Sequence, residues 1–275
     1  MLRSPLFEPL HPVLARLDAA RFPGLPECNA LLAAHASPIA VHSGLPLRFV
    51  PQQTGKLPFE AQYEPRCYLR GEVQTREDNW HDLFNALVWL TFPAAKAAIN
   101  AGHYRRLTGA EEARGGEAGG SSQRGKGRDM LTLLDESGVV VACANAELEG
   151  LLRGFQWQEL FWRRRARLAA GMGFYLFGHG LYEKALRPYV GMTGQGLILA
   201  VPQAFFGWPL GRRLAHLDGA LAAYLAGPDA AKAGPLGPRE LTPVPVLGVP
   251  GWSAQSASEF FYADSSYFRP GRLSS

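Results

Sequence analysis

The placement of prolines constrains this chain more than any other feature, because proline is poorly tolerated inside helices and inside sheets. Residues 1–75 are punctuated by proline throughout, and residues 227–251 hold six prolines. Long helices are therefore expected only between these two stretches. The sequence predicts a proline-rich N-terminal extension over residues 1–75 packed on the core, a helix-rich core domain over residues 76–226 and a proline-rich C-terminal strap over residues 227–275.

Several segments of the core stretch have helical spacing. The strongest is residues 79–92, in which leucines recur on one helical face. Asp78 or Asn79 is its expected N-cap, and Pro93 ends or kinks the helix. Further helices are expected over residues 94–107, 145–154, 156–171, 173–189 and 212–227.

A β-hairpin is expected near residues 129–143. Two apolar runs flank Glu136-Ser137-Gly138, and a glycine between such runs is typical of a hairpin turn. Under this interpretation Asp135 and Glu136 are ordinary turn residues. With one more strand over residues 196–201, the predicted fold class is α+β: a helix-rich single domain with a small sheet that includes this hairpin.

Residues 108–127 separate the predicted helices from the hairpin and are rich in Gly, Ser and charge. Such a segment has little apolar area to offset the entropy that it would lose on ordering. A mobile loop is therefore expected here, and it is unusually long for a loop inside a compact domain.

Composition narrows the class of protein and its surroundings. At 47% hydrophobic and 19% charged, the chain is too apolar to be disordered throughout, and a net charge of +4 lacks the density of a dedicated nucleic-acid binder. The three cysteines form no paired pattern, which predicts free thiols and a cytoplasmic location. The uncharged residues 188–211 contain three prolines and five glycines, so they are expected to be buried core and no membrane span is expected.

The helix over residues 79–92 carries polar residues with two interpretations. His81 and Asp82 suit a pair of metal ligands, or a general base with its orienting carboxylate, and Asn85 lies one turn further along. In the structural interpretation, Asp82 complements the helix dipole in the first turn and Asn85 bonds a neighbouring loop. Spacing alone favours the structural interpretation, because adjacent His and Asp are common.

A second helical segment places His179 and Glu183 four residues apart, with Lys184 beside them. Residues at this spacing can converge on a divalent ion, but they can equally form a local hydrogen bond. Nearby glycines, Gly178 and Gly180 among them, would let a ligand or another chain segment approach His179 closely.

One cluster of basic residues follows aromatic residues in the segment 157–167. Arg163, Arg164, Arg165 and Arg167 come directly after Trp157, Phe161 and Trp162. Arginines beside aromatics suit phosphates and stacked bases. A solvated helix face is the commoner structure for such a pattern.

Long blocks of the sequence resemble one family. They are DNWHDLFNALVWLTFPAAKAAIN, RDMLTLLDESGVVVACAN, FGHGLYEKALRPYVGMTGQGLIL, PVPVLGVPGW and FYADSSYFRP. In these blocks, from about residue 60 to the end, the chain resembles a bacterial family known as domain of unknown function number 3025. The resemblance implies a single family domain in a bacterial cytoplasm, but it implies no activity and carries over no catalytic residue.

These observations lead to two functional hypotheses. The first is a metal-assisted hydrolase, with a phosphoester as candidate substrate, in which His81, Asp82, His179 and Glu183 supply catalytic groups and ligands to a divalent metal. Arg128, Asn85 and Lys184 are then the expected substrate-binding residues, and Arg128 would hold an anionic substrate. The alternative is a non-catalytic module that binds nucleic acid or protein through the basic segment 157–167.

Overall fold

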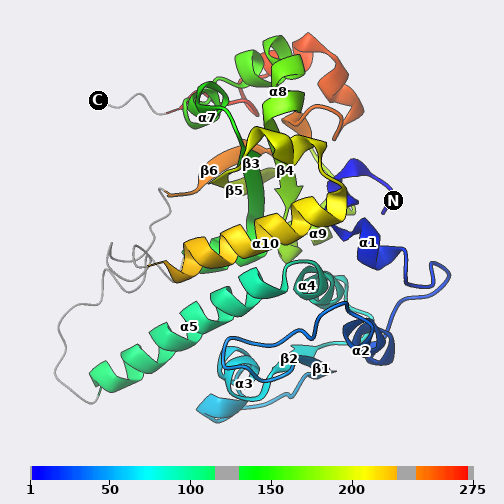
Figure 1. Cartoon of the computed structure of the whole chain (residues 1–275), viewed down its shortest axis with the longest axis vertical. Helices are drawn as coiled ribbons and strands as arrows, with labels where there is room; N and C mark the ends of the chain where they lie inside the picture. The colour runs from blue at the N-terminus through cyan, green and yellow to red at the C-terminus, as the bar shows by residue number, and fades with distance from the viewer. Residues whose placement is uncertain (1, 115–129, 228–239, 272–275) are drawn as a thin grey trace.

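The computed structural model describes residues 2–114, 130–227 and 240–271 (Figure 1). These residues form one helix-rich α+β domain with two small sheets. In Figure 1, the larger sheet lies in the upper half of the molecule, and the smaller sheet lies in the lower half among the earlier helices. None of the helices described is both long and apolar enough to cross a membrane.

The larger sheet has four strands in the order β4-β3-β5-β6. The central strand β3 (Gly138–Cys143) is buried throughout, as its run of valines suggests. It pairs antiparallel with β4 (Met172–Leu176) and parallel with β5 (Thr193–Ala200). The strand β6 (Thr242–Pro245) pairs antiparallel with β5, so the proline-rich C-terminal stretch contributes an edge strand.

The smaller sheet pairs β1 (Arg48–Pro51) with β2 (Glu72–Thr75) in parallel. The helix α3 (Tyr63–Arg70) lies between these strands in sequence and ends at Gly71, whose φ is 67°. A Cβ at Gly71 would also lie 2.2 Å from the carbonyl oxygen of Pro46. Both the left-handed backbone and the close approach therefore require glycine here.

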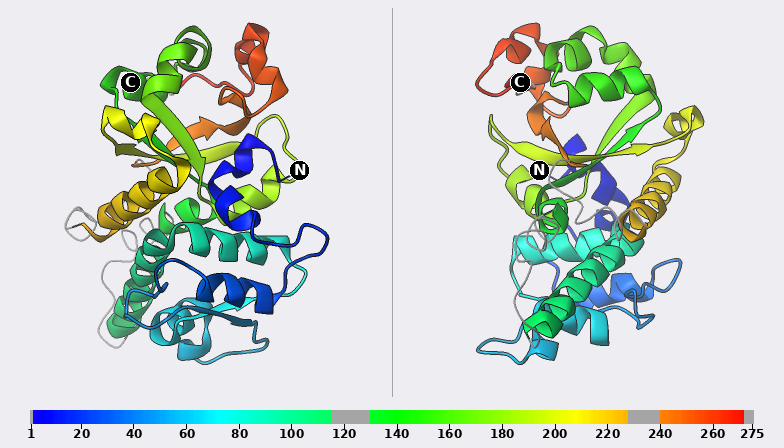
Figure 2. Two further views of the ribbon diagram at one scale, coloured as in Figure 1. Left: turned by 45° about the vertical axis from the view of Figure 1, so that its right-hand side comes forward. Right: turned by 90° about the vertical axis from the view of Figure 1, so that its left-hand side faces the viewer.

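Two long helices, α5 and α10, lie side by side in Figures 1 and 2. The helix α5 (Pro93–Arg114) follows α4 (Trp80–Thr91) directly. Asp218 of α10 (Leu210–Ala226) accepts hydrogen bonds from the backbone N–H groups of Ala94 and Ala95, at 3.1 and 2.8 Å. A carboxylate from one helix thus caps the other.

The N-terminal residues contribute to the same core. The 3₁₀ helix η1 (Pro5–Leu10) precedes α1 (His11–Leu14) and α2 (Leu25–Ala33). The ring of Phe7 in η1 stacks on those of Phe84 in α4 and Tyr182 in α9 (His179–Ala185), with centroids 5.8 Å apart in both pairs. Phe7 therefore packs between two helices that are distant in sequence.

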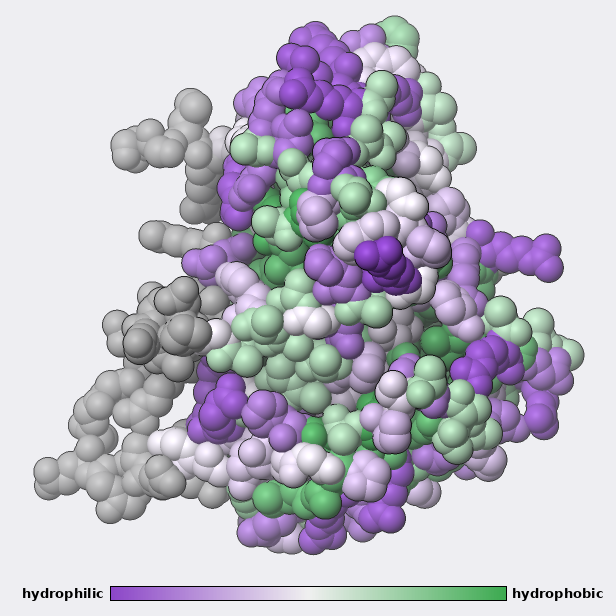
Figure 3. All heavy atoms as spheres, in the orientation of Figure 1, coloured by the Kyte–Doolittle hydropathy of each residue, from purple (hydrophilic) through white to green (hydrophobic). Residues whose placement is uncertain are grey.

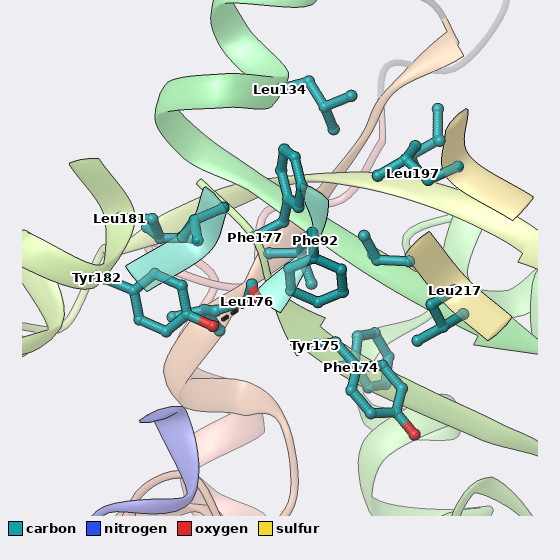
Figure 4. Close-up of a cluster of buried hydrophobic side chains, with 14 of the residues drawn as sticks. Phe92, Leu134, Phe174, Tyr175, Leu176, Phe177, Leu181, Tyr182, Leu197 and Leu217 are labelled. Atoms are coloured by element: carbon teal, nitrogen blue, oxygen red, sulfur yellow. Dashed lines mark hydrogen bonds between the residues drawn. The ribbon is translucent and has the colours of Figure 1, made fainter. Parts of the chain in front are cut away.

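The buried hydrophobic residues that the structure describes form one core cluster. Figure 4 shows aromatic and leucine side chains, such as Phe92, Phe177 and Leu197, packed together beside the strands. The remaining short helical elements are α7 (Ala146–Arg153), the π-helical turn Glu159–Arg163, α8 (Arg165–Gly171), η2 (Phe59–Ala61), η4 (Gln203–Gly207), η6 (Val246–Gly248), η7 (Ala254–Ala257) and η8 (Glu259–Ala263).

The predicted hairpin near residues 129–143 is wrong, because residues 130–137 are helical and β3 pairs with β4 and β5 instead. A short apolar run is compatible with either a strand or a helix. Met130, Leu131 and Leu134 lie at helical spacing, and all three are buried. The spacing of these three buried residues distinguishes a helix from a strand in this segment.

The predicted helix over residues 173–189 also needs correction. Its first part is the strand β4, and the helix α9 (His179–Ala185) begins only after Gly178. The aromatic run at 174–177 favours a strand.

The predicted loop over residues 108–127 begins later in the structure than expected, since α5 continues through residue 114. The rest of that loop lies outside the described residues.

Candidate metal centre

Two histidines from different helices meet at one point. His81 lies in the first turn of α4, which Asn79 caps by accepting a hydrogen bond from the backbone N–H of Asp82. His179 is the first residue of α9, directly after β4. Their Nε2 atoms lie 3.0 Å apart, so the two imidazoles share one site.

Glu136 brings a carboxylate to the same point. Its Oε1 lies 3.5 Å from His179 Nε2 and 3.8 Å from His81 Nε2. One ligand atom from each of the three residues can be chosen so that all lie within 4.8 Å of one another. Glu136 stands near the end of the helical segment 130–137, immediately before β3.

Glycines make this approach possible. A Cβ at Gly180 would lie 2.4 Å from Glu136 Oε2, and one at Gly178 would lie 2.4 Å from the backbone nitrogen of Gly138. Because Gly178 and Gly180 have no side chains, residues 136–138 can pack directly against the start of α9, beside His179.

Each imidazole has a second carboxylate at its other nitrogen. Glu183 Oε2 lies 3.0 Å from His81 Nδ1, and Asp135 Oδ2 lies 3.7 Å from His179 Nδ1. Asp135 in turn forms an ion pair with the buried Lys96. The Glu183 carboxylate fixes the orientation of the His81 imidazole and leaves its Nε2 facing the site, as in many zinc centres, whereas Asp135 is beyond hydrogen-bonding distance of His179 Nδ1.

Burial and neighbouring charges shift the pKa values of three residues at the site. Burial lowers the pKa of His179 to about 4, so this imidazole is neutral at physiological pH. Burial raises the pKa of Glu136, which the neighbouring His81 opposes. Burial alone would also raise the pKa of Asp135, but Lys96 and His179 outweigh it and the pKa is lowered.

Two imidazoles and one carboxylate form a donor set typical of zinc and similar divalent ions. Ligand nitrogens at ~2.0–2.1 Å from a tetrahedral ion are about 3.3 Å apart. The observed separation of 3.0 Å between the Nε2 atoms of His81 and His179 is close to that value. Three protein ligands would leave a fourth position for water or substrate.

The three residues open onto a cavity of about 420 Å³. Its walls are predominantly polar, and they come from α3, β2, α4, α5, the helical segment 130–137, the start of α9 and the residues that follow β1 and β2. The lining residues are Gln52, Tyr63, Glu64, Gln74, Arg76, His81, Asp82, Asn85, His103, Leu107, Thr132, Asp135, Glu136 and His179.

The structure brings together some of the predicted site residues and separates others. His81 and His179 share the site, and Glu183 lies beside His81 but on its outer nitrogen. Asp82 does not join them, because the backbone N–H of Arg76 and its guanidinium donate to its carboxylate at 2.7–2.9 Å. Burial would raise the pKa of Asp82, but Arg76 holds it lowered.

The three expected substrate-binding residues have different positions. Asn85 lines the cavity and donates to the hydroxyl of Tyr63 at 2.7 Å. Lys184 is exposed and is not among the residues that line the cavity. Arg128 lies outside the described residues.

Two site residues were missed from the sequence. The predicted hairpin places residues 130–135 in a strand, and it therefore makes Asp135 and Glu136 ordinary turn residues. With those residues in a helix, Asp135 and Glu136 stand at its end, beside the β3–β4 pair that leads to His179. The helical spacing of Met130, Leu131 and Leu134 was the available signal.

The basic cluster of segment 157–167 is largely paired within the molecule. Arg164 and Arg167 lie 2.7 Å from Glu159 and Glu147, respectively, and Arg163 lies 3.5 Å from Glu159. Arg165 stacks over the ring of Trp162 at 4.6 Å. Hydrophilic side chains gather at this end of the molecule, at the top of Figure 3, but acids accompany the arginines there.

Comparison with the curated proteins and comparison with the solved structures both found no match. One family model does match, over residues 47–272, and its description is "Protein of unknown function (DUF3025)". The matched range covers the sheet, the cavity and all three residues of the candidate metal centre. Because the match spans most of the 275 residues, the chain belongs to the DUF3025 family.

Proposed function

We propose that this protein is a metal-dependent hydrolase whose divalent ion, of the zinc type, is held by His81, His179 and Glu136. The observation that carries the proposal is the convergence of two Nε2 atoms, 3.0 Å apart, with a carboxylate oxygen within 3.8 Å of both. The carboxylate of Glu183 supports it, since its Oε2 lies 3.0 Å from His81 Nδ1 and orients that imidazole.

The chemistry follows from the open position at the ion. Three protein ligands with a fourth position open to a cavity are typical of catalytic rather than structural zinc sites. An ion held in this way would lower the pKa of a bound water to about 7 and so supply a hydroxide nucleophile at neutral pH. The cavity of about 420 Å³ accommodates a small organic substrate.

The cavity walls do not favour the phosphoester that the sequence suggested. Among its described lining residues, four are acidic, Glu64, Asp82, Asp135 and Glu136, and Arg76 is the one permanent cation. The guanidinium of Arg76 is already bound to Asp82. An anionic substrate would thus meet more negative than positive charge on the walls.

The proposal is tested on protein purified without a chelator and without a histidine tag. Elemental analysis is expected to find one zinc-type ion per chain, and the loaded protein is expected to hydrolyse members of a chromogenic panel of esters, amides and phosphoesters. Glu136→Gln should bind the ion more weakly and lose the activity. Protein that takes up no ion from micromolar zinc would contradict the proposal.

A further inference from the structure

The cavity has a second group of functional residues besides the metal centre. We call this the acceptor end, and it consists of Tyr63, Glu64 and Asn85, which lie on α3 and α4. None of these three belongs to the candidate ligands or to the carboxylates behind them. Their hydrogen-bonding state indicates what kind of ligand they would hold.

Glu64 is an acid whose direct partners are neutral. Its Oε2 accepts a hydrogen bond from Asn100 Nδ2 at 2.6 Å, and the same amide donates to its backbone oxygen at 3.0 Å. Two other acids of the wall pair with cations: Arg76 pairs with Asp82, and Lys96 pairs with Asp135. Burial accordingly raises the pKa of Glu64 to about 7.

The side-chain oxygen of Asn85 lacks a hydrogen-bond partner among the described residues. The residue is 7% exposed and lines the cavity, and this Oδ1 atom is buried. A 180° rotation of the amide would only exchange Oδ1 and Nδ2, so one polar atom remains for a ligand in either orientation. Leaving such an atom unpaired is costly, so a ligand that pairs with it would bind more tightly.

The acceptor end and the metal centre line the same cavity of about 420 Å³. Glu64 and Asn85 belong to its wall together with His81, His179 and Glu136. A small ligand that fills this cavity would therefore face both groups.

From this geometry we infer that the substrate carries a protonated amine beside the bond that is hydrolysed, as in an amide or ester of an amino acid. This inference rests on the proposed function. The ammonium group would bind Glu64 and Asn85 while the carbonyl oxygen faces the metal centre. Water then adds to the carbonyl carbon, the bond from that carbon to the leaving nitrogen or oxygen breaks, and the leaving atom takes the remaining proton of the water.

Binding of two matched hydroxamates to the zinc-loaded protein tests the inference. Alanine hydroxamate and N-acetylalanine hydroxamate carry the same metal-binding group, but only the first carries an ammonium group. Calorimetry at pH 7 should show the free amine binding at least about tenfold more tightly. In Glu64→Gln this ratio should fall to about one, whereas Glu60→Gln, an exposed glutamate in η2, should leave it unchanged.

The outcomes separate this inference from the proposed function. If neither hydroxamate binds, the metal centre itself is wrong and both proposals fail. If both bind equally well to the wild type, or if the ratio persists in Glu64→Gln, the metal centre stands and the ammonium site is overturned. Should Glu64→Gln fail to melt cooperatively, Asn85→Ser replaces it, and an unchanged ratio in that variant overturns the inference.

Discussion

The Nε2 atoms of His81 and His179 lie 3.0 Å apart, although 98 residues separate the two histidines in the sequence. Without an ion, one Nε2 can donate its hydrogen to the other. With an ion, both Nε2 atoms would offer lone pairs, and each neutral imidazole would carry its hydrogen on Nδ1. The same arrangement could thus hold either a hydrogen bond or an ion.

Removing either histidine should abolish metal binding. His81→Ala and His179→Ala each delete one of three ligands, so zinc uptake measured by elemental analysis should fall from one ion per chain to none. Both variants should still melt cooperatively, because α4 and α9 keep their other packing. His42→Ala, an exposed histidine outside the cavity, is the control and should bind the ion normally. Undiminished zinc binding in both site variants would show that the ion, if any, binds elsewhere.

Glu183 should affect the metal without touching it. Its Oε2 lies 3.0 Å from His81 Nδ1, and carboxylates in this position typically contribute 10–100-fold to metal affinity. Glu183→Gln is therefore expected to weaken zinc binding by about that factor in a competition titration with a chromogenic chelator. Glu77→Gln, an exposed glutamate before α4, provides the comparison and should bind with wild-type affinity. A complete loss of binding in Glu183→Gln would instead make Glu183 a direct ligand.

Asp218 should make stability depend on pH. Burial raises its pKa to about 6, so the folded protein binds its proton more tightly than the unfolded chain does. The stability that this preference contributes is complete below about pH 4 and is lost as pH rises through about 6. The loss amounts to at most about 3 kcal/mol by the usual conversion of a pKa shift.

Denaturant unfolding of wild type and Asp218→Asn at pH 4 and pH 7 measures this contribution. The free energy of unfolding of the wild type, relative to that of the variant, should fall as pH rises from 4 to 7. The amide side chain of the variant does not titrate. The change with pH in the difference between the two unfolding free energies therefore reports on the carboxyl group of Asp218. An equal difference at both pH values would show that the pKa of Asp218 is not raised.

Phe7 should stabilise both the fold and the metal centre. Its fully buried ring stacks on Phe84 and Tyr182, which lie three residues after His81 and His179 in their helices. Phe7→Ala is expected to lower the free energy of unfolding by about 3–5 kcal/mol and also to weaken zinc binding. Phe260→Ala removes a ring that is 88% exposed and should change neither quantity measurably. Normal stability in Phe7→Ala would show that η1 does not pack as described.

Much of the fold could be predicted from local sequence signals. The helix α4 was expected with Asn79 as a possible cap and Pro93 after its end, and the structure confirms both features. The proline distribution also predicted short elements at the N-terminal end, where α1 and α2 are only 4 and 9 residues long. Capping and proline act on adjacent residues, so one sequence is sufficient to detect them.

Segments with ambiguous periodicity were not predictable in this way. Residues 130–137 form a helix and residues 172–176 form a strand, the reverse of what was expected for both. Short apolar runs fit either structure, and the choice depends on their neighbours. Here β4 is a strand because it pairs with β3, and that pairing is long-range.

The sequence by itself singled out His81 and His179 as candidate site residues, because they stand as polar groups in otherwise apolar segments. Only the tertiary structure decided how the acids are used. Asp82, adjacent to His81, is bound by Arg76, whereas Glu136, assigned to a turn, reaches both imidazoles. The physical reason is that a carboxylate's role depends on the charges and N–H groups within about 4 Å of it, and packing between distant segments sets those distances.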